Sequence, residues 1–257
     1  MNGIDIFNLE DRVALVTGAG GGIGKVLSKG LASCGALVCT ADIDFESALE
    51  TSNEITNEGY KAKAFQIDVT SPESVKSLVD KIVETFRTID ILVNCAGIIS
   101  RIPSENMSKK DWDRIIEVNL TGSFLCCREV AKHMIQRQKG KIINISSMSA
   151  FIANKGRMNT AYSASKGGVV MLTKGLASEW AQYSINVNSI APGYIKTALN
   201  AISMNDKEVG DQWLAGTPLG RFGTPEDLVG IAVFLASSAS DFITGETIMI
   251  DGGFTIW

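Results

Sequence analysis

Two side chains suited to proton exchange stand four residues apart, Tyr162 and Lys166, in the segment AYSASK. If this segment is helical, a spacing of four places both side chains on one face, one turn apart. A fixed ammonium beside a phenol favours the phenolate and therefore lowers the pKa of the phenol. A phenol tuned in this way can exchange a proton with a carbinol near neutral pH.

A glycine-rich turn, TGAGGGIG at residues 17–24, follows an apolar run near the start of the chain. Because Gly18, Gly22 and Gly24 lack Cβ atoms, backbone N–H groups there can approach a pyrophosphate at a helix N-terminus, where the helix dipole favours negative charge. The spacing departs from the strict G-x-G-x-x-G pattern, since Ile23 occupies the third glycine position, and alone it also fits a turn without ligand. Together with the tyrosine and lysine, the turn predicts hydride transfer between a nicotinamide and a carbonyl or alcohol.

Asp42 ends the second apolar run, roughly 20 residues beyond the turn, where a carboxylate can accept hydrogen bonds from ribose hydroxyls. The same carboxylate would repel a 2′-phosphate, and the adjacent Ile43 offers no compensating charge. We therefore expect NAD as the cofactor in preference to NADP.

The composition is that of an ordinary globular enzyme, with 45% hydrophobic and 20% charged residues in 257 positions. Such a length fits one α/β domain with a large core. The net charge of −4, with scattered lysines and arginines, offers no basic face, so nucleic acid is not expected as a partner.

The sequence shows no targeting signal, membrane span or CxxC pair, and this predicts where the protein is located and the redox state of its cysteines. The N-terminal segment lacks a basic start followed by an apolar core, and no apolar run approaches a membrane span, so we expect a cytoplasmic protein without membrane contact. The cysteines form no CxxC pair and are expected to be reduced core thiols. With His133 as the single histidine, no metal site is expected. The cysteines are Cys34, Cys39, Cys95, Cys126 and Cys127.

Strand-like runs alternate with amphipathic, helix-like stretches along the chain. The expected strands are residues 13–17, 37–42, 62–68, 91–94, 141–146, 185–190 and 247–251. The expected helices include residues 23–34, 47–58, 72–86, 112–138, 161–183 and 225–236. This order predicts an α/β fold with a doubly wound, Rossmann-type parallel sheet of about seven strands in a single domain.

Sheets of this kind bind ligands outside the carboxyl ends of their strands, and the polar motifs of the chain fall at those places. In strand order they are the glycine turn, Asp42, Asp68, residues 94–97, residues 146–149, and Pro192 with Gly193.

These residues together resemble the short-chain dehydrogenase/reductase family, in its roughly 250-residue subclass, from Thr17 to the closing IDGG at 250–253. The resemblance implies a catalytic tetrad of Asn119, Ser147, Tyr162 and Lys166. By the family's pattern Tyr162 is the general acid and base, and Lys166 lowers its pKa and holds the nicotinamide ribose. The serine orients the substrate oxygen, and Asn119 positions a water that links Lys166 to solvent.

The resemblance also implies further cofactor contacts. Asp68 and Val69 would lie along the adenine. The family's N-N-A-G motif is matched by Asn94, Ala96 and Gly97, with Cys95 in place of the second asparagine. The loop that holds the nicotinamide carboxamide is matched by Pro192, Gly193, Ile195 and Thr197.

Two serines compete for the catalytic position. Alignment from the strand at 141–145 selects Ser147, whereas the commonest family spacing to the tyrosine selects Ser149. We assign Ser147, with a two-residue insertion within residues 151–160, where a loop tolerates it. Ser149 is then expected to face the substrate.

The substrate is less sharply defined by the sequence. Residues 97–101, 191–197 and 241–245 most resemble the gluconate 5-dehydrogenases and 2-deoxygluconate 3-dehydrogenases of the family. Of the two arginines that those enzymes carry after N-A-G, this chain keeps Arg101. Arg101 can hold a sugar-acid carboxylate in a bidentate fashion, or it can be a solvated loop residue. A polyol or a small hydroxy ketone fits as well.

Residues 196–219 lack clean periodicity and are expected to form a mobile substrate lid. By analogy with relatives of this length, we expect a homotetramer built from residues 119–138 and 161–183 and from the last strand, with the apolar residues 254–257 buried against a neighbouring subunit.

Two other functions compete with the dehydrogenase. The first is a 3-oxoacyl thioester (acyl carrier protein) reductase of the same fold, against which Asp42 and the low pI count. The second is a non-catalytic dinucleotide sensor, against which the complete tetrad counts.

Overall fold

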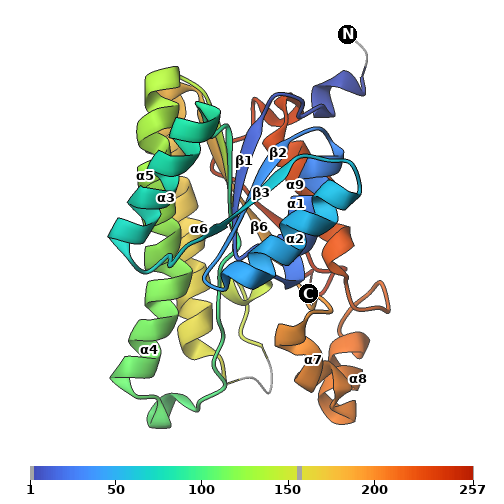
Figure 1. The fold of residues 1–257 in the computed structure, drawn as a ribbon. Coiled ribbons are helices and arrows are strands. Elements are labelled where there is room, and N and C mark those ends of the chain that lie inside the picture. The colour runs from blue at the N-terminus through green and yellow to red at the C-terminus, as the bar shows by residue number, and fades with distance from the viewer. Residues whose placement is uncertain (1–2, 155–157, 257) are drawn as a thin grey trace.

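A computed structural model describes residues 3–154 and 158–256 of the chain. Its strands form one parallel sheet in the order β3-β2-β1-β4-β5-β6-β7 (Figure 1). The predicted doubly wound sheet of seven strands is therefore confirmed, and the strand order reverses between β1 and β4. The strands are β1 (Val13–Thr17), β2 (Leu37–Asp42), β3 (Ala62–Gln66), β4 (Ile91–Asn94), β5 (Gly140–Ile145), β6 (Ile185–Pro192) and β7 (Thr247–Ile250).

Helices cover both faces of the sheet (Figure 1). One face carries α3 (Pro72–Phe86), α5 (Gly122–Arg137) and α6 (Thr160–Trp180), and the other carries α1 (Gly22–Ser33), α2 (Phe45–Asn57) and α9 (Val229–Ala236). Strands enclosed in this way need apolar side chains on both faces, and all residues of β1 and β4 are buried.

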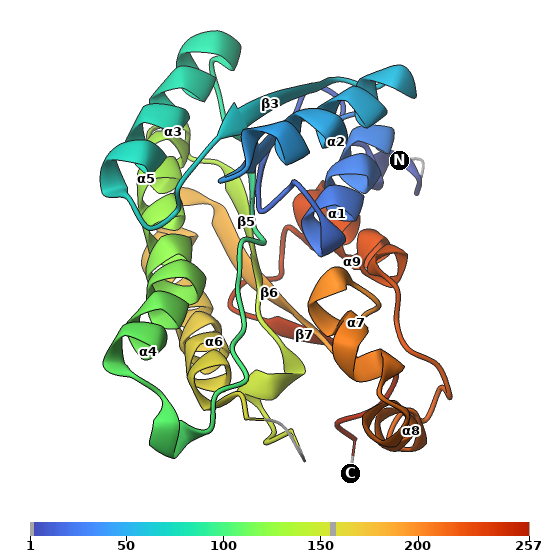
Figure 2. The same cartoon turned by 60° about the horizontal axis from the view of Figure 1, so that its bottom comes forward.

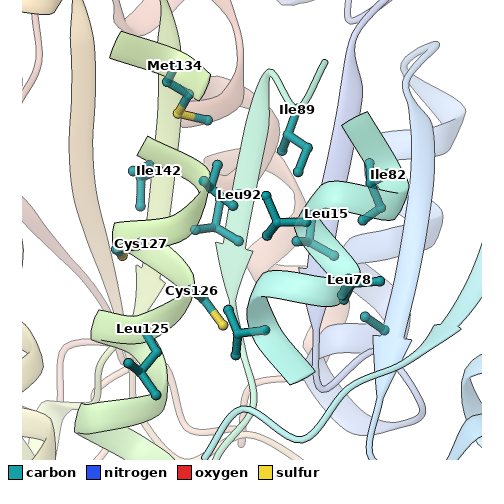
Figure 3. Close-up of a cluster of buried hydrophobic side chains, with 14 of the residues drawn as sticks. Leu15, Leu78, Ile82, Ile89, Leu92, Leu125, Cys126, Cys127, Met134 and Ile142 are labelled. Carbon is teal, nitrogen blue, oxygen red and sulfur yellow. The ribbon is translucent and has the colours of Figure 1, made fainter. Parts of the chain in front are cut away.

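The two faces of the sheet bury separate apolar clusters, because successive side chains of a strand point in opposite directions. Leu15 and Leu92 pack under α3 and α5 against Ile82 and Met134 (Figure 3). Their strand neighbours join the cluster under α1 and α9. The alternation fixes the register of each central strand, and therefore fixes where its carboxyl end lies.

The predicted helix at 112–138 is interrupted. α4 (Lys109–Ile116) continues into a π-helical turn, Glu117–Thr121, before α5 begins. A π turn adds a residue to the helical repeat, and such turns frequently occur at functional sites. Asn119 lies in this turn and is completely buried.

The expected lid at residues 196–219 contains two short helices, α7 (Ala198–Asn205) and α8 (Lys207–Ala215), near the C-terminal residues (Figure 2). Asp206 caps α8 by accepting hydrogen bonds from the N–H groups of Glu208 and Val209. Trp213 is buried, and its ring stacks on that of Tyr194, with the ring centroids 3.8 Å apart. This segment is therefore packed against the loop that follows β6.

All five cysteines are unpaired, and burial raises the pKa of the Cys39 and Cys127 thiols to about 12. Cys39, Cys126 and Cys127 are buried, whereas Cys34 and Cys95 are half-buried. None of the helices in the described part of the chain is long and apolar enough to cross a membrane. Within residues 3–154 and 158–256, no group of His, Cys, Asp and Glu side chains could hold a metal ion.

Candidate active site

A cleft of about 550 Å³ lies at the carboxyl ends of the strands and collects residues from eight segments of the sequence. Most of the predicted site residues line this cleft, although they are distant from one another in sequence. They are Gly18, Gly22, Ile23, Gly24, Asp42, Ile43, Asp68, Val69, Ala96, Gly97, Ser147, Tyr162, Lys166, Pro192, Gly193, Ile195 and Thr197.

The glycine turn is closed tightly on itself, and this closure requires glycine. A Cβ added at Gly24 would lie 2.1 Å from the carbonyl oxygen of Gly18, and one at Gly18 would lie 2.7 Å from the backbone of Ala96. Gly18 and Gly22 also have positive φ angles of 67° and 52°, which disfavour other residues. The turn brings the backbone to the start of α1 without side chains in the way, as a dinucleotide pyrophosphate requires.

Two carboxylates at strand ends are held by backbone N–H groups. Asp42 accepts hydrogen bonds from the N–H of Gly20 at 2.9 Å and from the N–H of Asp44 at 3.1 Å. Asp68 accepts from both the N–H and the hydroxyl of Thr70, at 2.9 and 2.7 Å. The Asp42 carboxylate is thus fixed between the glycine turn and the start of α2, on the wall of the cleft.

Lys166 carries a buried amine at the centre of the site. Its Nζ donates to the carbonyl oxygen of Ile145 at 2.7 Å and lies 5.7 Å from the centroid of the Tyr162 ring. Burial lowers the pKa of Lys166 from 10.5 to about 8. The amine therefore stays mainly protonated at neutral pH, beside the ring of Tyr162.

The two candidate serines have different surroundings. Ser147 lines the cleft with Tyr162, and its Oγ accepts a hydrogen bond from the N–H of Ser149 at 3.1 Å. The Oγ of Ser149 donates instead to Oδ1 of Asn154 at 2.6 Å, and Ser149 is not among the lining residues. The expected insertion falls partly on residues 155–157, which lie outside the described residues.

Asn119 lies behind the cleft. Its side-chain oxygen accepts from the N–H of Ile98 at 2.8 Å, while its Nδ2 donates to the Ile98 carbonyl and to the hydroxyl of Ser165. The amide therefore holds the loop after β4 against α6. Its partner in α6, Ser165, directly precedes Lys166. The water contact expected for Asn119 is not tested by these bonds.

Two further predicted residues are placed away from the cleft lining. The amide nitrogen of Asn94 donates to Oδ1 of Asn144 and to Sγ of Cys127, so this side chain lies in the interior between the sheet and α5. The guanidinium of Arg101 is exposed and donates to the carbonyl oxygen of Leu199 in α7 at 3.2 Å. Arg101 thus joins the loop after β4 to α7.

Several residues that line the cleft were not predicted from the sequence. Arg114 of α4 is exposed and borders the cleft with Val118, and Asn200 borders it from α7. Arg114 stands among other charged residues of an amphipathic helix, so only the packing of α4 distinguishes it from a solvated arginine. Cys95, noted as a departure from N-N-A-G, also lines the cleft.

Comparison with known proteins agrees with this arrangement. Residues 18–255 match the short-chain alcohol-dehydrogenase-type family described as enoyl-(acyl carrier protein) reductase. Gluconate 5-dehydrogenase of Gluconobacter oxydans (strain 621H) is 42% identical over 252 residues, which cover 98% of each chain. The chain belongs to the short-chain dehydrogenase/reductase family.

Two other members of the short-chain dehydrogenase/reductase family are also similar along nearly their whole length. The crystal structure of a gluconate 5-dehydrogenase from Burkholderia cenocepacia J2315, in complex with NADP and tartrate, has a TM-score of 0.95 and 42% identity, with 99% of each chain covered. An NAD-dependent glycerol dehydrogenase of Listeria innocua serovar 6a (strain ATCC BAA-680 / CLIP 11262) is 40% identical over 250 residues, covering 97% of this chain and 96% of its own.

The lowered pKa of Lys166 predicts a specific dependence of stability on pH. The unfolded chain keeps the ordinary pKa of 10.5, so between about pH 8 and pH 10.5 it binds more protons than the folded chain. The free energy of unfolding therefore gains a contribution that rises with pH in this window. Relative to Lys166→Met, the natural chain should gain up to about 3 kcal/mol between pH 7.5 and 10.5.

Urea unfolding of both proteins at several pH values, without dinucleotide and at one protein concentration, measures this difference. Groups distant from Lys166 cancel in the comparison, and repeating it in a Tyr162→Phe background removes the contribution of the neighbouring phenol. A difference in the free energy of unfolding that stays constant across the window would show that Lys166 titrates near 10.5 in the folded chain.

Proposed function

We propose that this enzyme transfers a hydride between NAD(H) and the carbinol or carbonyl carbon of a sugar acid or polyol, with a gluconate-like acid as the leading candidate. The observation that carries the proposal is the cleft itself, which joins Tyr162, Lys166 and Ser147 to the glycine turn and to Asp42. Tyr162, Lys166 and Ser147 can bind and transfer protons, whereas the glycine turn and Asp42 can bind a dinucleotide.

Tyr162 is the proposed general acid and base. In the oxidative direction its phenolate takes the proton of the substrate hydroxyl, and in the reductive direction the phenol returns it. The Lys166 ammonium, next to the ring in a buried environment, favours the phenolate. Ser147, which lines the same cleft, holds the substrate oxygen toward Tyr162.

Bound nicotinamide would supply the hydride acceptor or donor. The glycine turn would hold its pyrophosphate, Asp42 the adenosine ribose, and Asp68 and Val69 the adenine. Backbone groups after β4 and β6 would hold the nicotinamide half, from Asn94, Ala96 and Gly97 and from Pro192, Gly193, Ile195 and Thr197. Asn119 would keep the loop after β4 in register with α6, in addition to the water contact implied by the family pattern.

NAD is the proposed dinucleotide because of the charge at Asp42. Its carboxylate is fixed by two backbone N–H groups on the cleft wall, so it cannot turn away from a 2′-phosphate without losing both. Ile43 beside it is apolar and exposed, and provides no cation for that phosphate. The Burkholderia neighbour carries NADP, whereas the Listeria relative is an NAD-dependent enzyme, so the similarity alone favours neither dinucleotide.

The sugar-acid or polyol substrate is supported by the relatives, which include a gluconate 5-dehydrogenase and a glycerol dehydrogenase. Arg101 can hold an acid's carboxylate only by giving up or sharing its bond to the Leu199 carbonyl, which a carboxylate would replace with a stronger, charge-assisted bond. The segment 196–219, including α7, is the proposed substrate lid. Ser149 would contact substrate only if its bond to Asn154 were exchanged.

We further propose a cytoplasmic homotetramer. Phe124 of α5 and Met171 of α6 are apolar and exposed in the single chain, as a helix-pair interface would require. The C-terminal part of the proposed interface includes Trp257, which lies outside the described residues.

A 3-oxoacyl thioester reductase of the same fold is the alternative function. The acidic side chain of Asp42 disfavours it.

The proposal predicts reduction of NAD when the protein is mixed with aldonates or polyols, followed by nicotinamide absorbance. Tyr162→Phe removes the exchangeable proton and should lower kcat by about 10²- to 10⁴-fold on the active substrate. Its dinucleotide dissociation constant, measured by titration, should stay within about threefold of the natural protein. Full activity of Tyr162→Phe, or turnover of acyl thioesters alone, would refute the proposal.

The two serines give a second prediction, because only one lines the cleft. Ser147→Ala should lose about 10²-fold or more in kcat, whereas Ser149→Ala, which loses only the bond to Asn154, should lose about tenfold at most. Steady-state kinetics with the substrate found above measures both, and circular dichroism confirms that each variant folds. If only Ser149→Ala is inactive, the assignment of Ser147 is wrong.

Asp42→Asn removes the charge but keeps the shape of the side chain, and should shift the choice of dinucleotide. The ratio of kcat/KM for NAD to that for NADP should fall by about 10- to 100-fold, since a charged hydrogen bond is lost and a repulsion is relieved. Asp44→Asn is the matched control, two residues away and outside the cleft lining. Equal ratios in Asp42→Asn and the natural protein would remove Asp42 as the determinant.

A further inference from the structure

Four buried polar side chains form a network beside the cleft. Oδ1 of Asn154 accepts from the hydroxyl of Ser149 at 2.6 Å and from Nδ2 of Asn159 at 3.2 Å. Nδ2 of Asn154 donates to the hydroxyl oxygen of Tyr194 at 3.2 Å. Each of the four residues is between 7 and 9% exposed, so water competes little for these bonds. One amide therefore joins three separate segments.

Two of those segments carry the proton-transfer groups. The N–H of Ser149 donates to Oγ of Ser147, so Ser149 links Asn154 to the serine that lines the cleft. Asn159 directly precedes α6, and Tyr162 is the third residue of that helix. Asn159 makes no side-chain cap for α6, which fits the commitment of its Nδ2 to Asn154. The start of α6 is thus tied to the turn at Ser147.

The third segment belongs to the dinucleotide side of the cleft and to the lid. Tyr194 stands between Gly193 and Ile195, both of which line the cleft. Its ring lies flat on Trp213 of α8 and edge-on to Phe254 near the C-terminus, with centroid distances of 3.8 and 5.0 Å. A displacement of Asn154 would therefore move residues of α8 in the proposed lid as well as Ser147.

We propose that Asn154 is a positioning residue that sets Ser147 and Tyr162 in register with the loop after β6. It is not among the cleft-lining residues, so it acts through the groups that it holds. An amide suits this place because it presents an acceptor and a donor in one plane, which no apolar residue of its size can do. The kinetic consequences of this inference rest on the proposed function. The hydrogen-bond network is present whatever the activity.

Kinetics of four variants test the role. Asn154→Leu removes every bond of the amide and should lower kcat by about 10²-fold, as expected when reacting groups are misplaced by about 1 Å. The dissociation constant for NAD should change by a smaller factor than kcat, because the glycine turn and Asp42 are untouched and only the loop after β6 is loosened. Asn154→Asp keeps the acceptor and offers a second oxygen to which the Tyr194 hydroxyl can donate, so it should lose less kcat than Tyr194→Phe, which removes that bond and should lose about tenfold. Asn188→Leu is the control.

Asn188 is a suitable control because it is a buried amide of β6 that also bonds two ways, to the Ile243 carbonyl and to the N–H of Glu246. It does not line the cleft. Asn188→Leu should therefore lose a comparable amount of thermal stability and keep kcat within about twofold. If Asn154→Leu keeps kcat within twofold, or if both leucine variants lose kcat alike, Asn154 has no special positioning role.

Amide hydrogen exchange provides a readout that does not need turnover. Asn154→Leu should speed exchange in residues 147–150, 159–163 and 194–197, while β1 and β2 keep their protection. If the natural protein oxidised no sugar acid or polyol, the proposed function would fail, yet the exchange experiment would still decide whether Asn154 holds these segments. Unchanged exchange in all three segments would overturn the inference.

Discussion

The site depends on one buried charge, the Lys166 ammonium, and on the carbonyl of Ile145 that receives it. This bond joins α6 to the end of β5, a strand in the interior of the sheet, and so fixes Tyr162 one turn away. In the described part of the chain no carboxylate lies within ion-pair distance of Lys166, so the charge is held by burial against a backbone dipole. Burial without a neighbouring carboxylate is the physical reason for the lowered pKa of Lys166, whose amine lies beside the ring of Tyr162.

The sheet could be predicted closely from sequence because strands covered by helices on both faces are recognisable as short, continuous apolar runs. β1, β2 and β4 begin and end at the predicted residues, since runs such as Ile91-Leu92-Val93 are apolar on both faces and stop at polar residues. Pro72 likewise marked α3 from its first residue. The π turn around Asn119 was not predicted, because the polar and apolar pattern runs through it without a break. Helical periodicity also failed to reveal α7 and α8, which are too short to show a stable repeat.

The site was predictable where a motif ends a strand and obscure where tertiary packing decides. Gly18 and Asp42 meet in one cleft because the sheet brings the strand ends together, and Tyr162 joins them from α6, which is bonded to the end of β5 through Lys166. Asn94 ends a strand too, but its side chain faces the interior, where Asn144 and Cys127 take its hydrogen bonds. The direction of a strand's last side chain depends on register. Asn154 gave no signal, because its partners are 5 to 40 residues away and belong to loops of no regular period.

The closure of the glycine turn also limits how such a protein can diversify. With the Gly24 Cβ position 2.1 Å from the Gly18 carbonyl oxygen, no side chain can be accommodated there without opening the first turn of α1. In the proposed function the turn would hold the pyrophosphate, which all dinucleotide cofactors share, so it would not distinguish one of them from another. A lineage that exchanges one redox carrier for another would instead accumulate its changes at the tip of β2 and just beyond it, where Ile43 is 66% exposed and almost any residue can stand.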